Sequence, residues 1–97
     1  MAYDPGAIDA ALAAAVGDEP ALIAELHDAF RASAADAVQA MVMAVDGQSW
    51  RNAALRLKGL AASFGAIDLM AAATEAAEGG VGNAVALGRL RTLVAAL

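Results

Sequence analysis

The sequence predicts an all-α protein, an antiparallel up-down four-helix bundle with an additional short helix at its N-terminus. Three observations support this prediction: alanine dominates a chain of 97 residues that is 61% hydrophobic, aromatic residues and proline are scarce, and apolar residues recur at helical spacing between short polar breaks. Alanine has the highest helix propensity, whereas a β-sandwich would use more β-branched residues. The length fits one domain, residues 1–97, with one modest core.

The first two helices are expected to begin at proline. Asp4 can cap the free backbone N–H groups of a helix, and Pro5 fits its first position, so a short helix over residues 7–16 is expected to lie across one end of the bundle. A second helix opens at Pro20, after two acidic residues that suit the positive end of the helix dipole. Its buried stripe is predicted to contain Leu22, Ile23, Leu26, Phe30, Ala34, Ala37, Val38, Met41 and Val45.

Three more helices follow at short intervals. A turn at 46–48 precedes the third helix, with Ser49 as its predicted N-cap and Gly65 at its end. The fourth helix is expected over 68–78 and the fifth over 84–97. Connections this short make neighbouring helices run antiparallel. The inner faces of the third and fifth helices are predicted to carry Trp50, Ala53, Ala54, Leu57, Leu60, Ala61, Phe64, Ala86, Leu90, Leu93, Val94 and Leu97.

Charge and composition argue against several classes of function. The net charge is −5, and Lys and Arg form no extended patch, so nucleic acid is not an expected partner. With no cysteine and one histidine, the chain lacks the ligands of nearly every structural zinc site, and no metal or cofactor is expected. No uncharged apolar run approaches the roughly 20 residues of a membrane span, and no signal peptide is predicted. We therefore expect a cytoplasmic protein without a membrane partner.

The third helix carries a recognisable motif. Residues 54–69 read Ala-Leu-Arg-Leu-Lys-Gly-Leu-Ala-Ala-Ser-Phe-Gly-Ala-Ile-Asp-Leu. This segment resembles the histidine-containing phosphotransfer (HPt) domain, whose pattern is His-x-Leu-Lys-Gly followed by small residues, Gly-Ala and a leucine. The turn at 46–50, the helix order and the acidic Glu75 extend the resemblance over most of the chain after about residue 18. The matching positions are Leu57, Lys58, Gly59, Gly65, Ala66 and Leu69.

Leu55 stands where this family has its phospho-accepting histidine. The resemblance implies an exposed imidazole that takes a phosphoryl group from a receiver aspartate or a kinase. Leucine has no lone pair, so we expect no catalytic residue here and no enzymatic activity. His27, the single histidine, lies at the edge of the predicted stripe of the second helix. A structural role for it is favoured, and residual phosphotransfer through it is the alternative.

The surroundings of Leu55 predict a partner-binding site. Its neighbours at −4, +3, +4 and +7 share its face of the helix, and the site is predicted to comprise Arg51, Leu55, Arg56, Lys58, Gly59 and Ala62. Half of the six basic residues of the chain lie in this segment. The resemblance implies that this face docks a response-regulator receiver domain or a hybrid histidine kinase of a two-component phosphorelay, without accepting phosphate.

Two alternatives to this reading remain open. Gly59 inside a helix costs about 0.5–1 kcal/mol relative to alanine, and close packing against a neighbouring helix would explain it as well as a docking face would. The chain could also be a structural or self-associating helical bundle with no receiver partner. In that case Leu55, Gly59, Ala62 and Ala66 would contact another copy.

Overall fold

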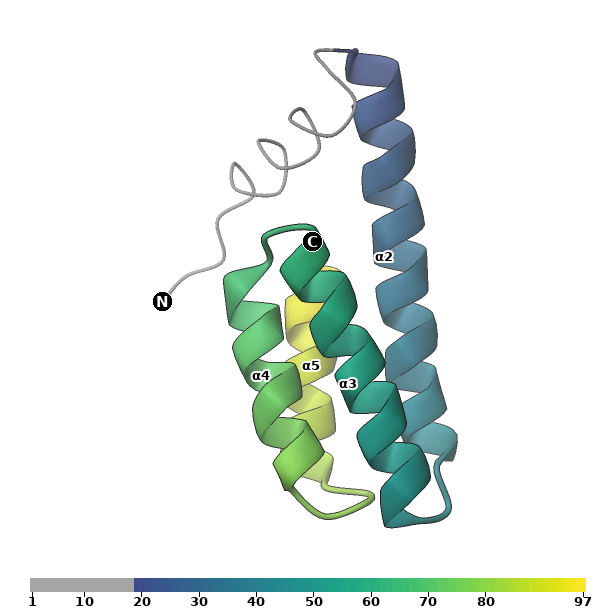
Figure 1. Cartoon of the computed structure of the whole chain (residues 1–97), viewed down its shortest axis with the longest axis vertical. Coiled ribbons are helices and arrows are strands. Elements are labelled where there is room, and N and C mark those ends of the chain that lie inside the picture. Colours follow the sequence, from purple (N-terminus) through teal and green to yellow (C-terminus); the bar gives the residue numbers. More distant parts are fainter. Residues whose placement is uncertain (1–18) are drawn as a thin grey trace.

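The computed structural model describes residues 19–97, which form four α-helices and no strand (Figure 1). α2 packs against α3 and α5, and α4 packs against the same two helices, so the four enclose one core. The predicted all-helical bundle is confirmed, whereas the expected helix over 7–16 lies outside the described residues. The helices are α2 (Pro20–Met43), α3 (Gly47–Ser63), α4 (Ile67–Glu78) and α5 (Ala84–Ala95).

The core combines a few large side chains with many alanines. Phe30 stacks on Phe64 with ring centroids 4.5 Å apart, which joins α2 to the end of α3. The buried indole Nε1 of Trp50 donates a hydrogen bond to the carbonyl oxygen of Ala76 at 2.7 Å, which joins α3 to α4. Alanines between these contacts let the helix axes approach closely. The largest fully buried side chains are Trp50, Phe30, Met41, Leu57, Leu69 and Leu90.

The start of α3 differs from the prediction. The N-cap is Asp46 rather than Ser49, and the helix begins at Gly47, within the expected turn. Asp46 has an extended backbone, and its Oδ1 accepts a hydrogen bond from the backbone N–H of Ser49 at 2.7 Å. This hydrogen bond stabilises the carboxylate and therefore lowers the pKa of Asp46 below its ordinary value.

The end of α3 follows the prediction. Gly65 has φ 71°, in the left-handed region that favours glycine, and the backbone N–H of Ala66 donates to the carbonyl oxygen of Ala61 at 2.9 Å. This C-cap turns the chain into α4, which begins at Ile67, one residue before the expected start. The last helix, α5, ends at Ala95 rather than at Leu97.

Two residues of the predicted stripe of α2 are not in the core. Val45 follows the helix and is 90% exposed, and Leu22 in the first turn is 41% exposed. With 24 residues α2 is about 36 Å long at 1.5 Å per residue, twice the length of the 12-residue α4 and α5. Its first turns project beyond the other three helices, so no described helix covers them (Figure 1).

Within residues 19–97, none of the helices combines the length and the apolar character of a membrane span.

Candidate partner-binding site

The outer face of α3 holds all the residues predicted to bind a partner. The inner face of this helix is filled by buried residues such as Trp50 and Leu57, so the opposite face points to solvent. Leu55 is 40% exposed, although it is a large apolar residue. Lys58 is half-buried at the edge of the face. The other predicted site residues are exposed: Arg51, Arg56, Gly59 and Ala62.

Gly59 lies in open space on this face. A Cβ built on it would meet nothing within 4 Å beyond its own helical turn in the part of the chain that the structure describes. Packing against a neighbouring helix, the structural alternative for this glycine, therefore does not hold for residues 19–97. Alanine would stabilise the helix by about 0.5–1 kcal/mol at this position. The fold itself thus gives no reason for glycine here.

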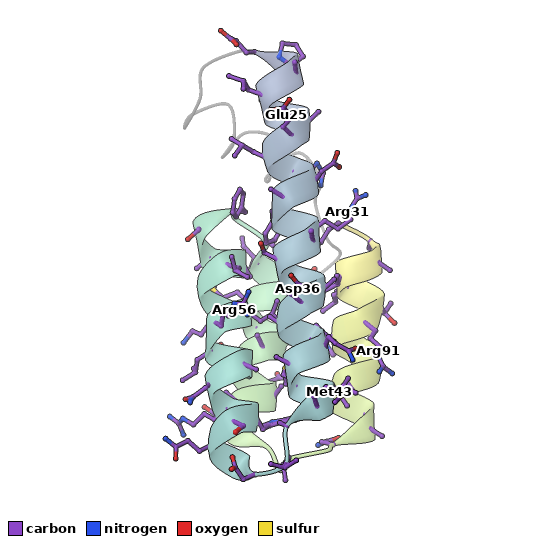
Figure 2. The ribbon with its side chains drawn as sticks, turned by 90° about the vertical axis from the view of Figure 1, so that its right-hand side faces the viewer. Glu25, Arg31, Asp36, Met43, Arg56 and Arg91 are labelled. Carbon is purple, nitrogen blue, oxygen red and sulfur yellow. The ribbon has the colours of Figure 1, made fainter. Side chains whose placement is uncertain are left out.

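The three basic residues of the site are not paired with carboxylates of the described chain, so their charges are available to a partner. Within residues 19–97, Arg51, Arg56 and Lys58 form no ion pair, whereas Arg89 pairs with Glu75 at 2.6 Å on the side of α4 that faces α5. Figure 2 shows Arg56 projecting from α3 on one side of α2, away from α5 on the other side. Among the described residues no carboxylate pairs with these cations. This local positive charge runs against the acidic net charge of the chain and suits an acidic partner.

A small apolar pocket adjoins the site between α3 and α4. Its volume is about 90 Å³, and Ala62 belongs to both the pocket and the predicted site. Ile67 lies at its rim and is 56% exposed. Sequence reasoning missed this pocket because helical spacing does not tell which flank of α3 faces α4. The pocket lies about two helical turns from Leu55 along α3 and adds apolar surface beside the site. It is lined by Ala61, Ala62, Gly65, Ile67 and Met70.

Three other predicted features lie apart from this face. Ala66 is 1% exposed, so of the four residues named for self-association it is not available for contact with another copy. Glu75, at the acidic position of the resemblance, pairs with Arg89 and so contributes nothing to the face on α3. His27 lies half-buried on α2, one turn before Phe30. No cluster of three or more potential metal ligands occurs among residues 19–97.

Comparisons with known proteins add no relative. No family model matches the chain. No curated protein and no solved structure matches it at a significant level. A proposal about function must therefore rest on the geometry of α3 and on the resemblance carried by residues 54–69.

Proposed function

We propose that this chain is a non-catalytic, HPt-like signalling module of a two-component phosphorelay in the cytoplasm. It docks a response-regulator receiver domain or a hybrid histidine kinase through the outer face of α3, and it accepts no phosphate. The observation that carries the proposal is the half-exposed Leu55 among unpaired cations, at the position where the family that it resembles has its histidine.

The absence of phosphotransfer follows from the chemistry of Leu55. An attack on phosphorus needs a lone pair, which an imidazole nitrogen supplies and an isobutyl group does not. Neither a shifted pKa nor a better orientation can replace that lone pair. A domain with this substitution acts on signalling only by binding, through competition for a receiver or through sequestration of it.

The proposed partner fits the chemistry of the α3 face. The phosphorylation pocket of a receiver domain carries several carboxylates, which Arg51 and Lys58 would oppose. Leu55 and the pocket beside Ala62 offer apolar contact of the kind found at the centre of protein interfaces. Gly59 lets the backbone of a partner approach the helix without meeting a side chain.

We also infer the up-down antiparallel order of the four helices. It is supported by the connections 44–46 and 64–66, which leave three residues each for a reversal between packed helices. The stacking of Phe30 on Phe64 supports it as well, because this contact places the middle of α2 beside the end of α3.

Charge reversal tests the docking site. Lys58→Glu and Arg51→Glu should each weaken the affinity for a receiver domain by about tenfold, because each turns an attraction to carboxylates into a repulsion. Arg91→Glu is the matched control, since Arg91 is exposed on α5, away from α3. Affinities are measured by calorimetry against receiver domains prepared with and without beryllofluoride. Unchanged affinity in both α3 variants would remove this face from the proposal.

A further inference from the structure

The apolar side of α2 continues onto turns that no described helix covers. Phe30 and Ala34 are fully buried, and Ile23 lies seven residues before Phe30, about two turns, so it shares their side of the helix. Leu26, one turn before Phe30, lies on the same side, and it is half-buried like Ile23. The exposed Glu25 lies on the opposite side, and Figure 2 shows it on the outer face of the projecting part of α2.

The projecting length of α2 matches that of a short helix. α2 has 24 residues, α3 has 17, and α4 and α5 have 12 each, so α2 is longer by about 10 to 18 Å. A helix over residues 7–16 would be about 15 Å long. At the base of the projection, Phe64 at the end of α3 stacks on Phe30. Ile23 and Leu26 on α2, together with Phe64, thus form an apolar corner, the α2–α3 corner.

The segment before α2 carries an apolar stripe of the kind that such a corner fits. Ile8, Leu12 and Val16 recur every four residues, so they share one face of the helix that the sequence predicts over 7–16. Asp9 is the one charged residue of this stretch, and alanine fills the remaining positions. A helix with so few charges needs a neighbour for its apolar face. Its alanines would let it approach α2 closely.

The connection to α2 keeps this stripe near the corner. Four backbone steps separate Val16 from Pro20, and they span at most about 14 Å. Ile23 and Leu26 lie about 5 and 9 Å along α2 from Pro20. The connection is therefore long enough to reverse the chain and to place the stripe beside both residues.

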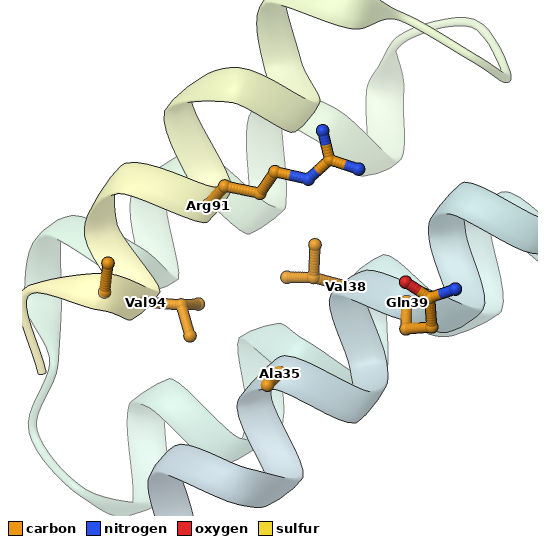
Figure 3. A pocket seen from close by; sticks show the side chains of 6 residues that line it. Ala35, Val38, Gln39, Arg91 and Val94 are labelled. Atoms are coloured by element: carbon orange, nitrogen blue, oxygen red, sulfur yellow. The ribbon is translucent and has the colours of Figure 1, made fainter.

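The other open apolar feature of α2 lies farther away. It is a groove of about 250 Å³ between α2 and α5, with Val38 and Val94 at its floor and Arg91 on its α5 wall (Figure 3). On α2 this groove begins at Ala35, about 22 Å from Pro20. A connection of at most about 14 Å cannot bring the end of the segment that far. The α2–α3 corner is thus the apolar surface within its reach.

We propose that residues 7–16 form a helix that packs its apolar stripe into the α2–α3 corner. The occupant of this surface is then a part of the chain itself and not a partner protein. His27 lies half-buried beside the corner, and its Nε2 is buried. A helix packed there keeps a receiver aspartate away from this imidazole, so His27 has a structural role and is no second phospho-acceptor.

Disulfide cross-linking in the whole chain tests this inference, because the sequence contains no cysteine. Leu12→Cys with Ile23→Cys should form a disulfide within one molecule, since a disulfide needs Cα atoms within about 7 Å of each other. Leu12→Cys with Glu25→Cys is the matched control, because Glu25 lies near Ile23 but on the outer side of α2. In a glutathione buffer at low protein concentration, mass spectrometry should show the first pair cross-linking at least about tenfold faster.

Two results of the cross-linking would overturn the inference. Equal rates for the two pairs would mean that the segment has no preferred position on α2. Cross-linked dimers in place of cross-linked monomers would assign the corner to a second copy of the chain.

Leu12→Gln gives a second test, without cysteine. Leucine and glutamine have similar helix propensities, so a fall in Tm reports lost packing. Tm should fall by about 4–8 °C, whereas Ala14→Gln, on the opposite side of the predicted helix, should change it by less than about 2 °C. An unchanged Tm in Leu12→Gln would contradict the proposed packing. Neither test uses a receiver domain, so both outcomes are independent of the proposed docking by α3.

Discussion

Gly59→Ala should make the isolated protein more stable and its proposed complex weaker. The two effects have opposite signs because the methyl group added at residue 59 has different surroundings in the free protein and in the complex. Within the monomer, the added methyl group meets open space on the outer face of α3. Within the proposed complex, it meets the backbone or side chains of the receiver domain. A change that separates stability from binding in this way distinguishes a docking glycine from a packing glycine.

The gain in stability follows from helix propensity alone. Alanine in a helix interior is favoured over glycine by about 0.5–1 kcal/mol, and no clash reduces this value because nothing lies within 4 Å of the added Cβ. For a domain of this size, the free energy of unfolding should rise by that amount, and Tm should rise by about 2–8 °C. The loss of affinity should grow with the size of the side chain, from Gly59→Ala to Gly59→Gln.

Gly88 provides a matched control in the same chain. It lies inside α5, is exposed, and has equally open space where a Cβ would stand. Gly88→Ala should therefore stabilise the fold as much as Gly59→Ala does, but leave receiver affinity unchanged. Urea denaturation gives the free energy of unfolding, and calorimetric titration with a receiver domain gives the affinity. A destabilised Gly59→Ala would refute the open-space argument, and equal affinities of the Gly59 and Gly88 variants would refute the docking role.

Three further predictions concern the core, the cap of α3 and the missing nucleophile. Trp50→Phe should lower the free energy of unfolding by about 1–3 kcal/mol in urea denaturation, because it removes the 2.7 Å hydrogen bond to Ala76 and leaves a void in the core. The capping Asp46 has a lowered pKa, so its contribution to stability is complete at neutral pH and is lost as the pH falls from the ordinary aspartate pKa through the lowered one. Asp46→Asn should remove that part of the pH dependence in acid titrations followed by circular dichroism, and a variant with the full dependence would contradict this assignment. Leu55→His should fold with a loss below about 1 kcal/mol, since the position is 40% exposed, and radiolabel transfer from a phosphorylated receiver tests whether it regains phospho-acceptance.

Much of the fold could be predicted because apolar spacing follows burial wherever helices have neighbours. Phe30, Met41 and Leu57 were assigned to the core from their helical spacing, and all three are fully buried. The same pattern was wrong at Val45 and in part at Leu22. Val45 lies beyond the last turn of α2, and Leu22 lies where α2 extends past its shorter partners. Periodicity along one helix contains no information about the length of the others.

The candidate site shows a second limit of sequence reasoning. The outward face of α3 follows from its buried face, so the exposure of Leu55 and Gly59 could be predicted. The pocket at Ile67 could not, because it depends on which flank of α3 meets α4. The N-cap was assigned to Ser49 instead of Asp46 because both residue types cap helices, and only the folded backbone shows which oxygen reaches a free N–H.

Mapping of the interface by NMR tests the central claim most directly. The isotope-labelled chain is titrated with a panel of receiver domains, each without and with beryllofluoride. The proposal predicts saturable shifts centred on Arg51, Leu55, Lys58 and Gly59, and the preferred state of the receiver then shows whether the module captures the active or the resting regulator. If no receiver in the panel shifts these resonances, or if the shifts centre on other helices, the proposal that α3 is a silent receiver-docking face is contradicted.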